Sequence, residues 1–235
     1  MDMGKLMEKV ICIGDSLTKG MIGFSYIDYL DKKYIYINKG VNGDTIICVL
    51  ERLKMCISDY PDVTKYIIAI GINDILVPYL AGLSPMWYKQ CKVAKLNTCL
   101  TSMKDFKMIY ETFVKLLKNN HKDVIIIGMP VIQLENFCID EEIKRNKYIK
   151  LIAKKYHYKF IDAYNIQLKY ANRYNVISWN QKNFKVLFDY YIMATKPSSK
   201  EKLSEKRNLE LTVDGVHYNE TSAYLIASEI NKKID

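Results

Sequence analysis

The chain has 235 residues, of which 49% are hydrophobic and 26% are charged. These proportions are typical of a globular protein, and they exclude a disordered chain; 10 glycines also exclude a collagen-like repeat. The length lies near the upper end of the single-domain range, so we expect one domain over residues 1–235. No apolar run approaches the roughly 20 residues of a membrane-spanning helix. The apolar run 10–13 is too short for a signal peptide and no cleavage site follows it, so we expect a cytoplasmic protein without stable membrane insertion.

The formal net charge is +9, yet only four of the 35 basic residues are arginine. Proteins that read nucleic acids favour arginine, whose planar fork matches guanine edges and phosphates, so we expect no nucleic-acid partner. The densest basic stretch, 196–207, also contains Glu201 and Glu205, which indicates a solvated helix face. A positive surface can still steer anionic substrates or favour membrane surfaces.

Cysteine and histidine spacing gives no sign of a metal site. The six cysteines include no C-x-x-C pair, and in a cytosolic protein they are expected to be buried or incidental thiols. The three histidines, His121, His157 and His217, are scattered and not close to paired cysteines, so we expect no zinc.

Five short runs of β-branched and aromatic residues predict buried strands. They lack the alternation of a half-exposed strand, which is typical of parallel strands covered by helices on both faces. In chain order the runs are 10–13, 34–37, 66–70, 124–127 and 158–161.

Amphipathic segments between and after these runs predict helices over 45–57, 106–117, 143–156 and 221–234. Asp44 or Thr45 is the expected N-cap of the first helix and Asn219 that of the last. Glu141 and Glu142 fall in the first turn of the third, where negative charge suits the helix dipole. The β–α alternation predicts a three-layer α/β domain with a mostly parallel sheet.

Two stretches, 76–101 and 165–211, do not fit this alternation. Loops of that length in a compact domain are functional or contain helices of their own. We expect both to be insertions, and the second to be a helical one near the carboxyl edge of the sheet.

Ser16 follows the first predicted strand, in the sequence Gly-Asp-Ser-Leu-Thr. Open α/β sheets bind ligands at this edge, and the preceding Gly14 allows a tight turn. A serine hydroxyl needs a base before it can act as a nucleophile. Taken alone, Ser16 is as well explained as a helix cap or a turn residue.

His217 is the candidate base, because Asp214 precedes it by three residues. A step through Gly215 can bring the carboxylate back onto the imidazole Nδ1 atom, which would fix the tautomer and stabilise the imidazolium. The alternative is a capped turn with a surface histidine.

Gly43 and Asn73 follow the next two predicted strands and are candidate donors to an oxyanion. The Gly43 amide is free to point into a cleft, and the Asn73 carboxamide is a neutral donor. An ordinary Asn-Gly turn and a helix cap are the alternatives. Asp15 and Asp74 are expected to organise these loops.

Together these motifs resemble those of the SGNH (GDSL) hydrolase family, the GDSL-like lipases and acylhydrolases. The first block of the family matches 14–17, the second Gly43, the third 71–74, and the last Asp214 and His217, in the family's order. The serine is not in a G-x-S-x-G elbow, which argues against the α/β-hydrolase fold.

The resemblance implies that Ser16 is the nucleophile, His217 the general base and Asp214 the residue that orients it. It implies an oxyanion hole formed by the Ser16 and Gly43 amides and the Asn73 side chain. It also implies an α/β/α fold whose five-stranded parallel sheet has flavodoxin-like order, with no metal or organic cofactor.

We therefore expect a serine esterase that hydrolyses carboxylic esters through an acyl-enzyme, with short acyl groups such as acetyl, including those on carbohydrates. The partner is then a small-molecule or saccharide ester. A lysophospholipase or acyl thioesterase with the same triad is one alternative. A non-catalytic flavodoxin-like module that binds a carbohydrate or a flavin is another. The oligomeric state is not indicated.

Asp15, Trp87 and Trp179 are the candidate substrate contacts. Phe24, Tyr26 and Tyr88 could also wall an acyl groove or stack on sugar rings. For each aromatic residue, ordinary core packing is an equally good explanation.

Overall fold

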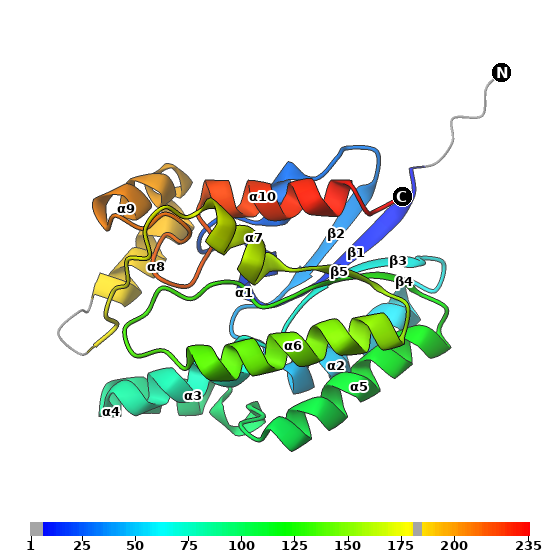
Figure 1. Cartoon of the computed structure of the whole chain (residues 1–235), viewed down its shortest axis with the longest axis horizontal. Helices are drawn as coiled ribbons and strands as arrows, with labels where there is room; N and C mark the ends of the chain where they lie inside the picture. Colours follow the sequence, from blue (N-terminus) through cyan, green and yellow to red (C-terminus); the bar gives the residue numbers. More distant parts are fainter. Residues whose placement is uncertain (1–6, 181–184) are drawn as a thin grey trace.

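The computed structural model describes residues 7–180 and 185–235 and has three layers, with a parallel sheet between two sets of helices. Figure 1 shows the strands running toward the end of the molecule where α3, α4, α8 and α9 gather. The predicted α/β/α class is confirmed, including the helices on both faces of the sheet.

The sheet has five parallel strands in the order β2-β1-β3-β4-β5, which is the flavodoxin-like order that the resemblance implied. Most strands begin and end within one or two residues of the predicted runs. The strands are β1 Lys9–Gly14, β2 Ile35–Gly40, β3 Lys65–Ala69, β4 Asp123–Ile127 and β5 Lys159–Ile161. The main difference is β2, which continues to Gly40.

The register of the sheet brings the carboxyl ends of all five strands to one edge. Gly14 of β1 pairs with Gly40 of β2 and with Ala69 of β3. Ala69 in turn pairs with Ile127 of β4, and Ile127 with Ile161 of β5. Segments that follow different strands therefore begin side by side.

Two layers of helices cover the sheet. One contains α2 (Ile46–Asp59), α5 (Met103–Asn119) and α6 (Ile139–Lys155); the other contains the short 3₁₀ helix η1 (Tyr26–Tyr29), α7 (Ala163–Tyr170) and α10 (Glu220–Asn231). Each of the four predicted helices is present. The expected cap of α10 is confirmed, because Asn219 Oδ1 accepts a hydrogen bond from the Ser222 amide at 2.9 Å.

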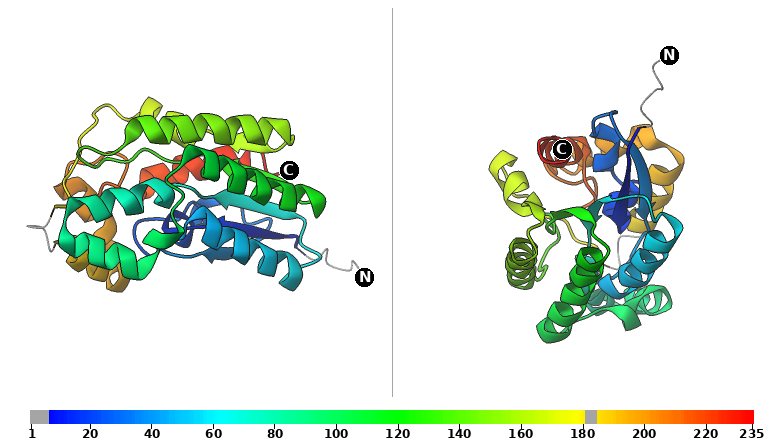
Figure 2. Two further views of the ribbon diagram at one scale, coloured as in Figure 1. Left: turned by 90° about the horizontal axis from the view of Figure 1, so that it is seen from below. Right: turned by 90° about the vertical axis from the view of Figure 1, so that its right-hand side faces the viewer.

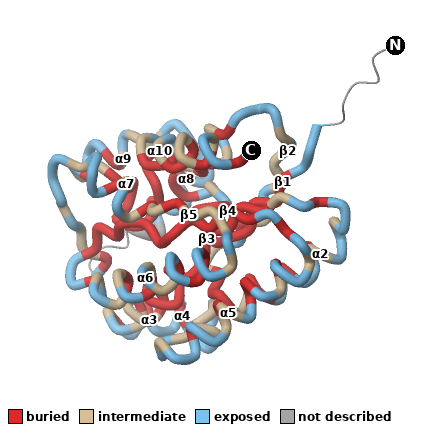
Figure 3. Tube along the Cα trace, turned by 45° about the vertical axis from the view of Figure 1, so that its right-hand side comes forward, coloured by how far each residue is buried: buried red, intermediate tan, exposed pale blue. Residues whose placement is uncertain are grey.

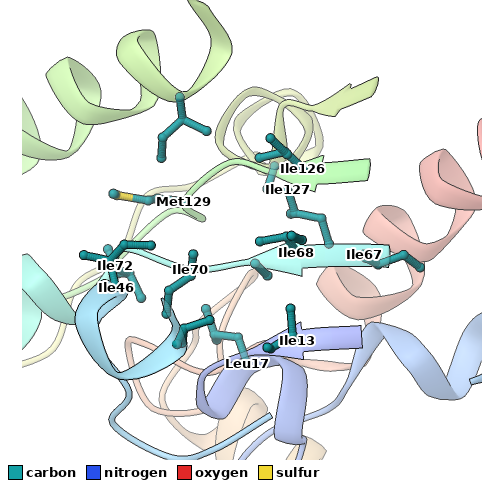
Figure 4. Packing of buried hydrophobic residues seen from close by; sticks show 14 of the residues in the cluster. Ile13, Leu17, Ile46, Ile67, Ile68, Ile70, Ile72, Ile126, Ile127 and Met129 are labelled. Atoms are coloured by element: carbon teal, nitrogen blue, oxygen red, sulfur yellow. The ribbon is translucent and has the colours of Figure 1, made fainter. Parts of the chain in front are cut away.

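The core lies on both faces of the sheet, as the buried trace in Figure 3 shows. The side chains of Ile67 and Ile68 in β3 are both fully buried although they point to opposite faces. This is why the strand runs are apolar throughout. Figure 4 shows isoleucines from β1, β3 and β4 packed with Leu17 and Met129.

Both stretches outside the alternation contain helices. The first holds α3 (Asn73–Leu83), α4 (Pro85–Ala94) and the 3₁₀ helix η2 (Leu96–Thr98). The second holds most of α7, then α8 (Lys185–Thr195), the 3₁₀ helix η3 (Pro197–Ser199) and α9 (Lys200–Lys206), while 181–184 lie outside the described residues. Figure 2 shows both groups at the carboxyl end of the sheet.

Within residues 7–180 and 185–235, none of the helices combines the length and the apolar character needed to cross a membrane.

Candidate active site

The chain turns sharply after β1 and begins α1 (Ser16–Lys19) with Ser16 as its first residue. A side chain at Gly14 would lie 2.2 Å from Thr18 Oγ1 and 2.4 Å from the Ala69 carbonyl oxygen, so only glycine fits there. Asp15 caps α1 by accepting a hydrogen bond from the Leu17 amide at 2.9 Å. This turn places the Ser16 hydroxyl at the carboxyl edge of the sheet.

His217 and Asp214 lie beside Ser16, although 201 residues separate the serine from the histidine. The Ser16 hydroxyl is 3.0 Å from His217 Nε2, and His217 Nδ1 is 2.7 Å from Asp214 Oδ2. The imidazole Nδ1–H donates to the carboxylate in this geometry, which leaves the Nε2 lone pair to accept the serine proton.

The loop that carries Asp214 holds its carboxylate in place. Asp214 Oδ1 accepts hydrogen bonds from the backbone amides of Val216 at 3.0 Å and His217 at 2.8 Å. Burial alone would raise the pKa of Asp214, but the charge of His217 and these hydrogen bonds outweigh it and the pKa lies below its usual value. Asp214 is therefore ionised beside the imidazole at neutral pH.

Gly43 and Asn73 border the same space as Ser16. Gly43 has a positive φ of 73°, and no atom lies within 4 Å of the position that a side chain would occupy. One N–H of the Asn73 carboxamide donates to the Asp44 carbonyl oxygen at 2.9 Å. Because an amide nitrogen carries two hydrogens, Asn73 has a second N–H that can donate to another acceptor.

These residues line a cavity of about 320 Å³. Besides Ser16 and His217, its polar lining includes Asn42 and Gln90. Most of the wall is apolar and is formed by Ile22, Leu76, Val77, Leu80, Trp87 and Trp179. This volume is near the lower limit of the range for small-molecule sites, which is about 300 to 1,000 Å³.

Trp87 and Trp179 join the two stretches outside the alternation at this cavity. Their rings stack 5.7 Å apart with an interplanar angle of 17°. The Trp87 indole N–H donates to the Trp179 carbonyl oxygen, and the Trp179 indole N–H donates to the Asp214 carbonyl oxygen, both at 2.7 Å. Trp179 therefore both lines the cavity and supports the loop that carries Asp214.

A single sequence profile covers almost all of the chain. The profile of the GDSL-like lipase/acylhydrolase family matches residues 10–230. The chain belongs to this family. It is accordingly a GDSL-type serine ester hydrolase, which decides between an enzyme and the non-catalytic binding module considered from the sequence.

Solved structures share the fold at low sequence identity. A lipase/acylhydrolase from Enterococcus faecalis is 17% identical with a TM-score of 0.60, over 97% of this chain and 98% of the other. A variant of an acetyl xylan esterase from Geobacillus stearothermophilus is 17% identical with a TM-score of 0.61, over 97% and 94%. A GDSL-like lipase from Bacteroides thetaiotaomicron is 16% identical with a TM-score of 0.62, over 97% and 88%. A search of curated proteins gave no match.

Asp15 is not among the residues that line this cavity of the enzyme. Its side chain is 1% exposed, and Oδ2 has no hydrogen-bond partner among the described residues. Burial raises the pKa of Asp15 to about 7. The structure thus gives Asp15 the loop-organising position that the sequence suggested, and it gives no sign of the substrate contact.

Asp74 also has the position expected for a loop organiser. Its carboxylate accepts hydrogen bonds from the Ile46 amide at 3.0 Å and the Leu100 amide at 2.8 Å, and burial raises its pKa to about 6. Thr45, one of the two residues expected there, is the N-cap residue of α2, but its side chain makes no capping hydrogen bond. Asp74 supplies the side-chain acceptor for the Ile46 amide at the start of this helix.

Of the aromatic candidates for substrate contact, only Trp87 and Trp179 line the cavity. Tyr26 is fully buried beneath α1, Phe24 packs against the core, and Tyr88 is exposed on α4.

Sequence reasoning missed the apolar wall formed by Leu76, Val77 and Leu80 of α3. Their spacing at positions i, i+1 and i+4 was a signal of a helix face, directly after the motif that contains Asn73. No comparable signal pointed to Tyr190 of α8, which lines the cavity from a segment far along the chain.

No group of three or more histidine, cysteine, aspartate or glutamate side chains suited to a metal ion occurs in the described ranges 7–180 and 185–235. All six cysteines are free thiols.

Proposed function

We propose that the enzyme hydrolyses carboxylic esters through a covalent acyl-enzyme, with Ser16 as the nucleophile. The observation that carries this proposal is the hydrogen-bonded series from Ser16 Oγ to His217 Nε2 and from His217 Nδ1 to Asp214 Oδ2. A nucleophile, a base and a carboxylate that orients the base are the parts that acyl transfer needs.

In the first half-reaction, Ser16 Oγ attacks the ester carbonyl carbon while His217 Nε2 takes the hydroxyl proton. The tetrahedral intermediate then collapses, the bond to the alcohol oxygen breaks, and His217 returns the proton to the leaving alcohol. In the second half-reaction a water molecule attacks the acyl-serine, again giving its proton to His217. The carboxylic acid leaves and Ser16 recovers its proton.

The negative oxygen of each tetrahedral intermediate would be bound by the Ser16 and Gly43 amides and by the free N–H of Asn73. The positive φ of Gly43 and the fixed carboxamide of Asn73 support these roles, because both donors are oriented before substrate arrives.

Replacing Asn73 with alanine is expected to lower kcat by about 10²- to 10³-fold, since it removes one oxyanion donor. KM should change little, because the donor is used mainly in the transition state. Initial rates with p-nitrophenyl acetate measure both quantities. As a control, Asn165→Ala on the exposed side of α7 should keep the wild-type kcat; an Asn73→Ala enzyme with wild-type kcat contradicts the oxyanion role.

An acetylxylan esterase from Geobacillus stearothermophilus, which has the same fold, has a serine, an aspartate and a histidine whose replacements are described as catalytic mutants. Structures of that protein described as catalytic mutants replace a serine, an aspartate and a histidine with alanine. That description supports the roles proposed for Ser16, Asp214 and His217, on a chain only 16% to 18% identical.

We further propose that the acyl group is short, as in acetyl esters, including those on carbohydrates. The small volume of the cavity supports a short acyl group. The apolar wall formed by α3 and the two tryptophans favours a second candidate, an ester or thioester with a longer hydrocarbon chain, as in a lysophospholipase or an acyl thioesterase.

A chain-length series separates the two candidates. The highest value of kcat/KM should belong to one of the short p-nitrophenyl esters, acetyl, butyryl or hexanoyl. The value for the dodecanoyl ester should be at least about tenfold lower, because its longer chain does not fit the volume of the cavity. Acetylated sugars, a lysophospholipid and an acyl thioester are assayed beside them. A maximum at dodecanoyl, or a faster reaction with the lysophospholipid, supports the second candidate.

A further inference from the structure

A buried carboxylate lies directly beside the Gly43 loop and has no place in the proposed reaction. Asp44 is 2% exposed and contacts two cations from different parts of the chain. Arg52 of α2 donates from Nε to Asp44 Oδ2 at 2.9 Å and contacts the same oxygen through Nη2. Lys95, 51 residues away in the stretch 76–101, contacts Asp44 Oδ1.

Arg52 also connects this carboxylate, through hydrogen bonds, to the ends of β1 and β2, the two strands that precede the loops with Ser16 and Gly43. Its Nη2 donates to the carbonyl oxygen of Gly14, the last residue of β1, at 2.9 Å. Its Nη1 donates to the carbonyl oxygen of Lys39 in β2. The guanidinium therefore joins the base of the Ser16 turn to the base of the Gly43 loop through a rigid, planar group.

The backbone of Asp44 contacts the oxyanion donors themselves. Its carbonyl oxygen accepts the hydrogen bond from Asn73 Nδ2 at 2.9 Å, which fixes the rotation of the carboxamide and so the direction of its free N–H. The Asp44 amide donates to the Val41 carbonyl oxygen at 3.2 Å, and the Val41 amide donates to the Gly14 carbonyl oxygen at 3.1 Å. A shift of Asp44 would therefore move both Gly43 and Asn73.

We propose that Asp44 is a positioning residue for the oxyanion hole, and that Arg52 and Lys95 hold it in place. Asp44 touches no reacting atom; it acts through the Gly43 peptide and the Asn73 carboxamide. This inference rests on the proposed function, because it assigns a purpose to the geometry of those two donors.

Two physical features make this cluster suited to that purpose. Oxyanion donors are effective only when they are oriented in advance, and a buried carboxylate with charged partners on both oxygens has little freedom to move. Two cations against one carboxylate also leave one positive charge beside the loop, which favours a developing negative oxygen.

The direct test is a double-mutant cycle between Asp44 and Asn73. Asp44→Asn keeps the backbone and the size of the side chain but removes the charge that holds the two cations. In the wild-type background it should lower kcat by about 10- to 100-fold and change KM by no more than about twofold. In the Asn73→Ala background the same change should lower kcat by only about threefold, because the Asn73 donor is already absent and only the effect of Asp44 on the Gly43 amide remains.

Equal effects of Asp44→Asn in both backgrounds, or a raised KM with unchanged kcat, overturn the inference. A general loss of stability is checked with Val114→Ala, which removes buried methyl groups from α5. That variant should lower the midpoint of thermal unfolding and leave kcat unchanged, so a fall in kcat cannot be attributed to destabilisation alone.

If Asp44→Asn does not fold, Lys95 provides a second test, because its side chain is 26% exposed. Lys95→Met should lower kcat by about threefold to tenfold, whereas Lys95→Arg, which keeps the positive charge, should retain most of the wild-type kcat. A Lys95→Met enzyme with wild-type kcat overturns the part assigned to Lys95. The proposed function fails separately, when the Ser16→Ala variant hydrolyses the ester as fast as the wild type.

Discussion

Replacing Ser16 with alanine is expected to lower kcat for p-nitrophenyl acetate by about 10⁴-fold or more. His217 would then have no alcohol oxygen at 3.0 Å to deprotonate, so no acyl-enzyme could form. The oxyanion donors and the cavity would remain, and they account for any residual rate above the uncatalysed hydrolysis.

The fold should tolerate this change. Alanine at the first position of α1 removes one hydroxyl group at the border of the cavity, and the cap from Asp15 to the Leu17 amide stays. The thermal unfolding midpoint should therefore remain close to that of the wild type. Ser228→Ala, in α10, is the matched control and should keep full activity. Wild-type turnover by Ser16→Ala contradicts the mechanism.

The largest expected effect on stability concerns Glu142, in the first turn of α6. Its side chain is fully buried, and neither carboxyl oxygen has a hydrogen-bond partner in the described part of the chain. Burial raises the pKa of Glu142 from 4.5 to about 9. The folded protein thus keeps this carboxyl protonated at neutral pH, whereas the unfolded chain releases the proton.

The consequence is that Glu142 lowers stability as pH rises. Between the unfolded pKa near 4.5 and the folded pKa of about 9, the unfolded state binds fewer protons, and each pH unit costs the folded state about 1.4 kcal/mol. Glu142→Gln is neutral in both states and removes this cost. The difference in unfolding free energy between Glu142→Gln and the wild type should therefore increase in favour of the variant by about 3 kcal/mol from about pH 5 to about pH 7.5.

Urea denaturation of both proteins at the two pH values measures this difference. Comparing the same pair of proteins cancels the contributions of Asp15 and Asp74, whose pKa values are also raised by burial. Glu205→Gln removes an exposed carboxyl of α9 and should show no such growth with pH. A Glu142→Gln protein with the same pH dependence as the wild type contradicts the protonated, buried state.

Much of the site could be predicted because its residues follow consecutive parallel strands. Ser16 comes just after β1, Gly43 after β2 and Asn73 after β3, and parallel strands in register place their carboxyl ends at one edge. The one remote element, the turn with Asp214 and His217, could be joined to them only through the chemistry that a serine nucleophile requires.

Contacts between distant segments left no pattern in the sequence. Trp87 and Trp179 are 92 residues apart, and Lys95 reaches Asp44 from 51 residues away. Such pairs depend on how the helices beyond the sheet pack, which neither periodicity nor local spacing encodes. The sequence therefore indicated which candidate active-site residues lie together better than it indicated the walls of the cavity.

Glu142 shows how local rules can mislead. A glutamate in the first turn of a helix is expected to be charged and to favour the helix dipole. In α6 the glutamate instead faces the interior, where the cost of burying a charge exceeds the gain from the dipole.

The most direct test of the proposed mechanism is covalent labelling with a fluorophosphonate, followed by mass spectrometry of the digested protein. The wild type should carry one phosphonyl group on the peptide that contains Ser16, and His217→Ala should react far more slowly, because no base then activates the hydroxyl. An enzyme that hydrolyses esters while Ser16 stays unlabelled, or a His217→Ala variant labelled at the wild-type rate, would contradict the account.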